Sequence, residues 1–161
     1  MNAHQLRDII EEGENDRIEF KRCGNQPEKD LFETICAFAN TFGGTILLGV
    51  EDDGSLTGVN SAQVLPVTRN ILNVVSNPNA FDVPVSLEFE HIEIDDRQII
   101  KIDVPNSPQM HSYKSKVYER RGDADIVVRG SAPLAELCIR KQGIYLSLIH
   151  ISEPTRLALI S

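Results

Sequence analysis

The chain has 161 residues, of which 41% are hydrophobic and 25% charged, and this composition is typical of one soluble globular domain. Three widely spaced cysteines, Cys23, Cys36 and Cys138, exclude a disulfide framework and a zinc site built on CxxC pairs. No stretch approaches the roughly 20 apolar residues of a membrane span, and the N-terminus lacks the pattern of a secretory signal. We therefore expect a cytoplasmic protein with reduced thiols.

The formal net charge of −8 argues against nucleic-acid binding over the whole surface. The charge is unevenly distributed, however, because residues 1–99 carry 7 Lys/Arg against 18 Asp/Glu, whereas residues 100–161 carry 9 against 6. This asymmetry permits a basic strip for a phosphate backbone beside an acidic pocket for a metal ion. Ordinary solvated surface on both halves explains the same charges.

Hydrophobic periodicity predicts helices over 3–13, 28–42 and 61–76 and one that begins near Ser131. It predicts strands over 18–21, 45–50, 55–59, 85–94, 100–104 and 116–121. A one-residue slip in the alternation of the 85–94 strand predicts a β-bulge near His91. This order of elements favours an α+β fold, a mixed sheet with hairpins flanked by helices, as a single domain over residues 1–143.

Residues 144–161 do not fit this organisation, since they show no clear period and contain Pro154. The segment resembles the translated read-through of a sequencing adaptor. We therefore expect a non-native tail on a natural protein that was truncated near Ile144. A genuine C-terminal strand or tail is the alternative.

The stretch 35–54 is the expected architectural centre. An apolar helix end leads through the pair Gly43-Gly44 into a short buried run, which ends in the acids Glu51-Asp52-Asp53 and the turn residue Gly54. Glycine suits a helix C-terminus, where a positive φ is common. The sequence thus predicts a helix, a tight turn and a central strand that delivers carboxylates to one end of the sheet.

A first candidate site combines those acids with Glu14 and with Glu19 and Lys21, which lie on the predicted strand over 18–21. If the two strands are neighbours, three carboxylates could converge near one sheet end. Carboxylates with open water positions suit Mg²⁺ or Mn²⁺, which can activate water, and a lysine can contact a phosphate or a developing oxyanion. A solvated strand face with a weak Glu19–Lys21 pair is the alternative.

A second candidate site is a basic strip. Alternation places Lys116, Tyr118 and Arg120 on one face of a strand, with Lys114 and Arg121 nearby. Cations beside an aromatic ring suit contacts to a phosphate backbone and stacking on a base. An exposed edge strand protected by its charges is the alternative.

Several motifs then follow one another along the chain: Glu14-x4-Glu19-Phe20-Lys21, Ala37-Phe38-Ala39-Asn40-Thr41-x-Gly43-Gly44, Gly49-Val50-Glu51-Asp52-Asp53-Gly54 with Gly58, and Tyr118-x-Arg120-x-Gly122. Together they resemble the Schlafen-type Alba-2 domain over about residues 4 to 141. The resemblance implies an α+β domain that is described as binding DNA or other nucleic acid. In bacteria such domains form the N-terminal part of longer transcriptional regulators or ATP-binding, helicase-related proteins. No Walker motif is present, so ATP binding would belong to another part of such a protein.

Some animal relatives cleave RNA with three carboxylates, and by resemblance these fall on Glu14, Glu19 and Asp52, with Glu51 and Asp53 as alternatives in register. Those relatives build their RNA groove from a duplicated domain, so a homodimer would supply the second half here.

Our first hypothesis is a nucleic-acid-binding module that uses the basic strip. The alternative is a Mg²⁺- or Mn²⁺-dependent endoribonuclease with catalytic Glu14, Glu19, Lys21 and Asp52, in which the three acids hold the metal. A protein-interaction domain is a third hypothesis.

Overall fold

The computed structural model describes the backbone of residues 1–152 and the side chains of residues 1–143. Its helices are α1 (Ala3–Glu12), α2 (Leu31–Asn40), α3 (Val64–Ser76) and α4 (Ser131–Ser152), with a short 3-10 turn at Ser61–Gln63. Its strands are β1 (Ile18–Lys21), β2 (Gly44–Leu48), β3 (Glu88–Ile94), β4 (Arg97–Val104), β5 (Tyr118–Arg121) and β6 (Ala124–Val127).

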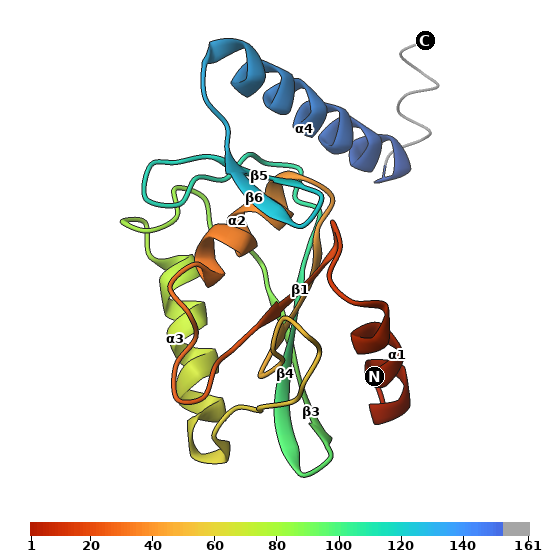
Figure 1. Ribbon diagram of the computed structural model, residues 1–161. Coiled ribbons are helices and arrows are strands. Elements are labelled where there is room, and N and C mark those ends of the chain that lie inside the picture. Colours follow the sequence, from red (N-terminus) through yellow and green to blue (C-terminus); the bar gives the residue numbers. More distant parts are fainter. Residues whose placement is uncertain (153–161) are drawn as a thin grey trace.

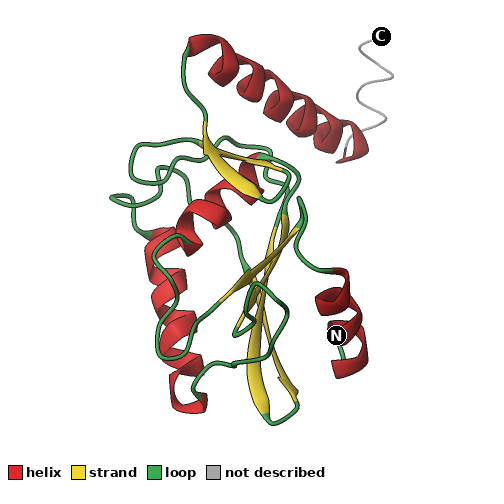
Figure 2. Cartoon of the chain, viewed as in Figure 1, coloured by secondary structure: helices red, strands yellow, loops and turns green. Residues whose placement is uncertain are grey.

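The strands form a four-stranded mixed sheet in the order β1-β2-β4-β3 and a separate two-stranded hairpin, β5-β6 (Figures 1 and 2). β1 runs parallel to β2, with Glu19 opposite Ile46, whereas the other pairs are antiparallel. Helices flank the sheet, so the predicted α+β class is confirmed.

Both faces of the large sheet are buried. On one face, α2 and α3 pack against the sheet in a core that includes Ile35, Ile71 and Ile100. On the other face, α1 contributes Leu6 to a second core. Figure 1 shows the two layers, with α1 on the opposite side of the sheet from α2 and α3.

This double coverage explains why the predicted bulge near His91 is wrong. β3 pairs with β4 in unbroken register from Glu88 to Ile94. Phe89 packs against the α2–α3 core, whereas Ile92 and Ile94 belong to the α1 core. The apolar side chains change face because each end of the strand is covered on a different side.

The stretch 35–54 is central, as predicted. Nine of the ten residues of α2 are buried. A Cβ on Gly43 would lie 2.7 Å from the carbonyl oxygen of Val104, and a Cβ on Gly44 would lie 2.8 Å from the ring of Phe38. The glycine pair therefore lets the end of α2 approach β4 closely. The predicted strand over 55–59 is wrong, since only a single bridge joins Val50 and Leu56.

α4 is anchored by two buried side chains one turn apart, Leu137 and Lys141. The Lys141 ammonium donates to the carbonyl oxygen of Ala39 at 2.9 Å and to that of Thr41 at 3.4 Å, at the C-terminal end of α2, where a cation is favoured. Burial, with the nearby charge of Arg140, lowers the pKa of Lys141 to about 8.

The backbone of α4 continues past residue 144 as far as Ser152. The expected non-native tail thus begins inside this helix, and its residues 153–161 lie outside the described part of the chain. Within that described part, no helix is long and apolar enough to cross a membrane.

Candidate functional site

Glu14 lies in the turn that leads into β1, and its carboxylate accepts a hydrogen bond from the backbone of that strand. The N–H of Phe20 donates to Glu14 Oε1 at 2.9 Å. β1 is an edge strand with β2 as its only ladder partner in the described sheet, so this bond satisfies a donor that the sheet leaves unpaired. Glu14 thereby protects the free edge of the sheet.

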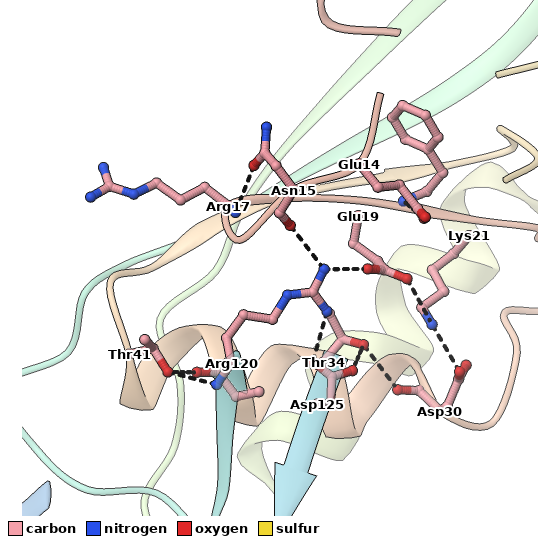
Figure 3. A network of polar contacts seen from close by, with 12 residues as sticks. Glu14, Asn15, Arg17, Glu19, Lys21, Asp30, Thr34, Thr41, Arg120 and Asp125 are labelled. Carbon is pink, nitrogen blue, oxygen red and sulfur yellow. Dashed lines mark hydrogen bonds and ion pairs between the residues drawn. The ribbon is translucent and has the colours of Figure 1, made fainter. Parts of the chain in front are cut away.

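Glu19 and Lys21 lie on the same face of β1, as the alternation predicted, but that face is covered by α2 and the β5–β6 hairpin. The Glu19 side chain is only 12% exposed and that of Lys21 7%. Lys21 Nζ lies 3.4 Å from Glu19 Oε1 and donates to Asp30 Oδ2 at 2.8 Å. Figure 3 shows these groups gathered between β1 and the start of α2. The solvated strand face is therefore excluded.

Arg120 enters the same network from β5. Its guanidinium donates to Glu19 Oε2 at 2.5 Å, to Asp125 Oδ1 at 2.8 Å and to the carbonyl oxygen of Asn15 at 3.1 Å (Figure 3). It also lies over the ring of Phe38, 4.9 Å from the centroid. Only 1% of the side chain is exposed. The expected exposed position of Arg120 on a basic strip is therefore wrong, and its guanidinium joins the hairpin to β1.

Burial and pairing shift the pKa values of this network in a consistent way. Burial raises the pKa of Glu19, and it outweighs the favourable charges of Arg120 and Lys21, while the nearby carboxylate of Glu14 raises it further. For Lys21 and Arg120 burial acts against the charged form, but hydrogen bonds to the surrounding carboxylates more than compensate and raise both pKa values. The two cations thus remain charged at neutral pH.

Asp52 does not join Glu14 and Glu19. It lies exposed in the turn after β2, where Glu51 pairs with Arg22 at 3.1 Å and Asp53 accepts from the N–H of Ser55. In residues 1–143, no three His, Cys, Asp or Glu side chains are placed to share a metal ion. Both oxygens of Glu19 already contact cations. In this arrangement the predicted carboxylate set does not fit a divalent metal.

A second set of side chains lines a groove between the start of α2 and the segment 113–118. It has three lysines, three aromatic residues and one acid: Lys29, Lys114 and Lys116; Phe32, Tyr113 and Tyr118; and Glu33. We call it the basic groove. All three lysines are exposed. The groove therefore carries a net positive charge on a chain that is acidic overall.

Lys114 and Lys116 are held on a tight turn. The N–H and C=O of Tyr113 both bond to the backbone of Lys116, at 2.8 and 3.0 Å. Lys114 and Ser115 are the two central residues of this turn, and their φ values are 48° and 66°. Such left-handed conformations cost non-glycine residues free energy and are enriched at binding sites. The turn projects two lysines at the cost of local strain.

The aromatic residues form the floor of the basic groove. Tyr118 is only 7% exposed, and the ring of Tyr113 lies 5.8 Å from that of Phe32 and under Lys114. The Tyr118 hydroxyl donates to Glu33 Oε1 at 3.3 Å. Burial and the charge of Glu33 raise the pKa of Tyr118, so the hydroxyl keeps its proton. Because Phe32, Tyr113 and Tyr118 are all buried, the floor offers little aromatic surface for stacking on a base.

Of the five residues predicted to contact nucleic acid, Lys114, Lys116 and Tyr118 lie together in the basic groove. Arg121 does not join them: it is exposed, and Glu119 pairs with it at 2.7 Å. Sequence reasoning missed Lys29, Phe32 and Glu33, because the start of α2 reaches the groove only through tertiary packing. Tyr113, adjacent to Lys114, was the one omitted residue that the local sequence could have indicated.

Comparisons with known proteins place this geometry in a family. Residues 14–129 match the family model described as Schlafen, AlbA_2. Comparison with curated proteins gave no match. Among solved structures, the chain is similar to the solution structure of the N-terminal domain of a RecG-related protein from Nitrosomonas europaea, with 25% identity and a TM-score of 0.55. That match covers 78% of this chain and 92% of the other.

A crystal structure of a Corynebacterium diphtheriae protein shares the fold at 19% identity, with a TM-score of 0.53. That match covers 78% of this chain and 29% of the other. The family match spans more than half of the chain, from Glu14 through the β5–β6 hairpin. The chain therefore belongs to the Schlafen AlbA_2 family.

Proposed function

We propose that this domain binds nucleic acid through the basic groove. The observation that carries the proposal is the convergence of three exposed lysines on one groove of an otherwise acidic chain. Lysines neutralise phosphates and release condensed counterions, and this supplies much of the affinity of such complexes. The similarity to a domain of a protein described as related to a DNA helicase supports the same class of ligand.

The test compares two double variants that remove the same charge. Lys114→Gln/Lys116→Gln removes two cations from the groove. Arg7→Gln/Arg97→Gln removes two cations that do not line the groove. Arg7 belongs to α1, which lies across the sheet from α2 (Figure 1), and Arg97 is the first residue of β4. Binding of a labelled oligonucleotide is followed by fluorescence anisotropy over a range of salt concentrations.

Each lost phosphate contact flattens the dependence of log K on log salt by about 0.7 for a single strand. We expect the groove variant to lose affinity and to flatten the slope by about 1.4, and we expect the remote variant to behave like the unmodified protein. Equal effects of the two variants would show that the groove is not the site.

A metal-dependent endoribonuclease is the second candidate. The position of Glu14 supports it, because its Oε1 accepts a hydrogen bond at 2.9 Å from the N–H of Phe20, the residue that follows Glu19. Asp52 does not lie with these two carboxylates, and Glu19 is paired with Arg120. Activity would therefore require a rearrangement that brings Asp52 to them and separates Arg120 from Glu19. Cleavage of structured RNA with and without Mn²⁺, by the unmodified chain and by Glu19→Gln, tests this activity. Equal cleavage by both, or none, would exclude it.

We further propose that the domain is a module of a longer bacterial regulator or ATP-binding, helicase-related protein. The similarity to an N-terminal domain over 92% of its length supports this assignment. A homodimer that combines two basic grooves is a related proposal, which sedimentation equilibrium with and without oligonucleotide tests.

A further inference from the structure

Glu33 is an unexpected residue in the basic groove. It lies in the first turn of α2, half buried, among three lysines that suit an anionic ligand. Within residues 1–143, the hydrogen bond that its carboxylate accepts comes from the Tyr118 hydroxyl, at a long 3.3 Å. A carboxylate at this place repels phosphate, so its presence requires a different explanation from that of the lysines.

A carboxylate is only a hydrogen-bond acceptor, and it has about four acceptor positions. The bond from Tyr118 occupies one of them and holds Oε1 in place. Glu33 lines the groove together with the three lysines, so its remaining positions are available to a ligand that binds there. A ligand that presents phosphates to the lysines would therefore gain most if it also presented N–H donors to Glu33.

Among the common bases, guanine offers two adjacent donors, N1–H and the 2-amino group, which match both oxygens of a carboxylate. Adenine and cytosine offer one amino group beside an acceptor nitrogen, and uracil offers one N–H between two carbonyl oxygens. A neighbouring acceptor would face the carboxylate unfavourably in each of these three cases. Guanine is therefore the base that fits Glu33 best.

We propose that Glu33 reads guanine in a single strand whose phosphates contact Lys29, Lys114 and Lys116. This inference rests on the proposed function and extends it to base specificity. It requires an unpaired segment, because base pairing occupies N1–H and the 2-amino group of guanine. The buried Tyr118 acts as a positioning residue, since its hydroxyl orients the Glu33 carboxylate.

The first experiment uses the unmodified protein and four labelled single-stranded oligonucleotides of equal length. Each is a run of uridines with one central guanosine, inosine, adenosine or cytidine, a design in which the strands do not pair with one another. Inosine differs from guanosine only by the missing 2-amino group, so it removes one of the two proposed bonds. We expect the guanosine strand to bind about fivefold or more tightly than the other three, because a bidentate contact to the correct base gives discrimination of at least that size.

The second experiment repeats the comparison with Glu33→Gln. Glu11→Gln, on the exposed surface of α1, serves as the matched control. The amide of glutamine presents one donor and one acceptor, so we expect the guanosine preference to disappear while the salt dependence stays. Circular dichroism verifies that both variants are folded. Glu33→Asp, which keeps the carboxylate, should retain part of the preference.

The outcomes separate the two proposals. Binding of all four strands with equal affinity would overturn the role of Glu33 and leave the groove as a phosphate site. A guanosine preference that survives in Glu33→Gln would also overturn it. Absence of binding to any strand would overturn the proposed function, and the inference with it.

Discussion

The buried guanidinium of Arg120 allows a sharp prediction, because the next residue provides a matched control. Arg120 is 1% exposed and pairs with Glu19 and Asp125, whereas Arg121 is 67% exposed and pairs with Glu119. Arg120→Ala leaves Asp125 without its cation and Glu19 with Lys21 alone. Arg121→Ala removes a solvent-exposed cation from Glu119, which keeps Arg140 at 3.5 Å. The two substitutions are chemically identical and differ in burial.

Removal of one partner from a buried ion pair costs about 3–5 kcal/mol. A pair whose cation lies in solvent, as Arg121 does, contributes less, about 0–1 kcal/mol. The free energy of unfolding of a domain is only about 5–15 kcal/mol, so Arg120→Ala removes a large part of it. With a urea m-value of about 1–3 kcal/mol/M, the unfolding midpoint should fall by about 1 M or more.

The assay is equilibrium unfolding in urea at neutral pH, followed by far-ultraviolet circular dichroism. We expect a large fall in the midpoint for Arg120→Ala and little change for Arg121→Ala. A double variant, Glu19→Met/Arg120→Met, should cost less than the sum of its two single substitutions, because neither charge is then left buried alone. Equal midpoints for the two alanine variants would refute the account of this network.

Three further predictions concern local conformation and titration. Ser115→Gly should raise the free energy of unfolding by about 1 kcal/mol, since it relieves a φ of 66°, and an unchanged urea midpoint would contradict this. Gly44→Ala should lower it by about 1–3 kcal/mol, because the new methyl group would meet the ring of Phe38 at 2.8 Å, and a midpoint equal to that of the unmodified chain would argue against this close packing. Burial lowers the pKa of His111 below its usual 6.5. The unfolded chain therefore takes up this proton first, so stability falls as pH drops below about 6.5, and His111→Gln should reduce that pH dependence of the urea midpoint.

Much of the fold follows from local sequence patterns. α1 ends at Gly13, which adopts a φ of 83°, and it begins with a capping box between Asn2 and Gln5. α3 and β1 likewise follow their hydrophobic periods. The short strand β6 was missed, because four residues with one turn signal carry too little pattern to be recognised.

The errors at the candidate site share one physical cause. Period-two alternation correctly placed Tyr118 with Arg120 and Glu19 with Lys21, but it cannot tell whether a given face meets water or another layer. Here α2 and the β5–β6 hairpin cover the polar face of β1. The charged side chains that were predicted to face solvent therefore form a buried network. The groove residues Lys29 and Glu33 were missed because no local pattern relates the start of α2 to the 113–118 turn.

The most direct test of the central claim is a nitrogen–proton NMR titration of the isotopically labelled chain with a single-stranded oligonucleotide. We predict that the largest changes in amide chemical shift occur over 29–33 and 113–118, the two segments that form the basic groove. Changes confined to the acidic turn over 51–54, or the absence of any change at saturating oligonucleotide, would contradict the assignment of the groove as the binding site.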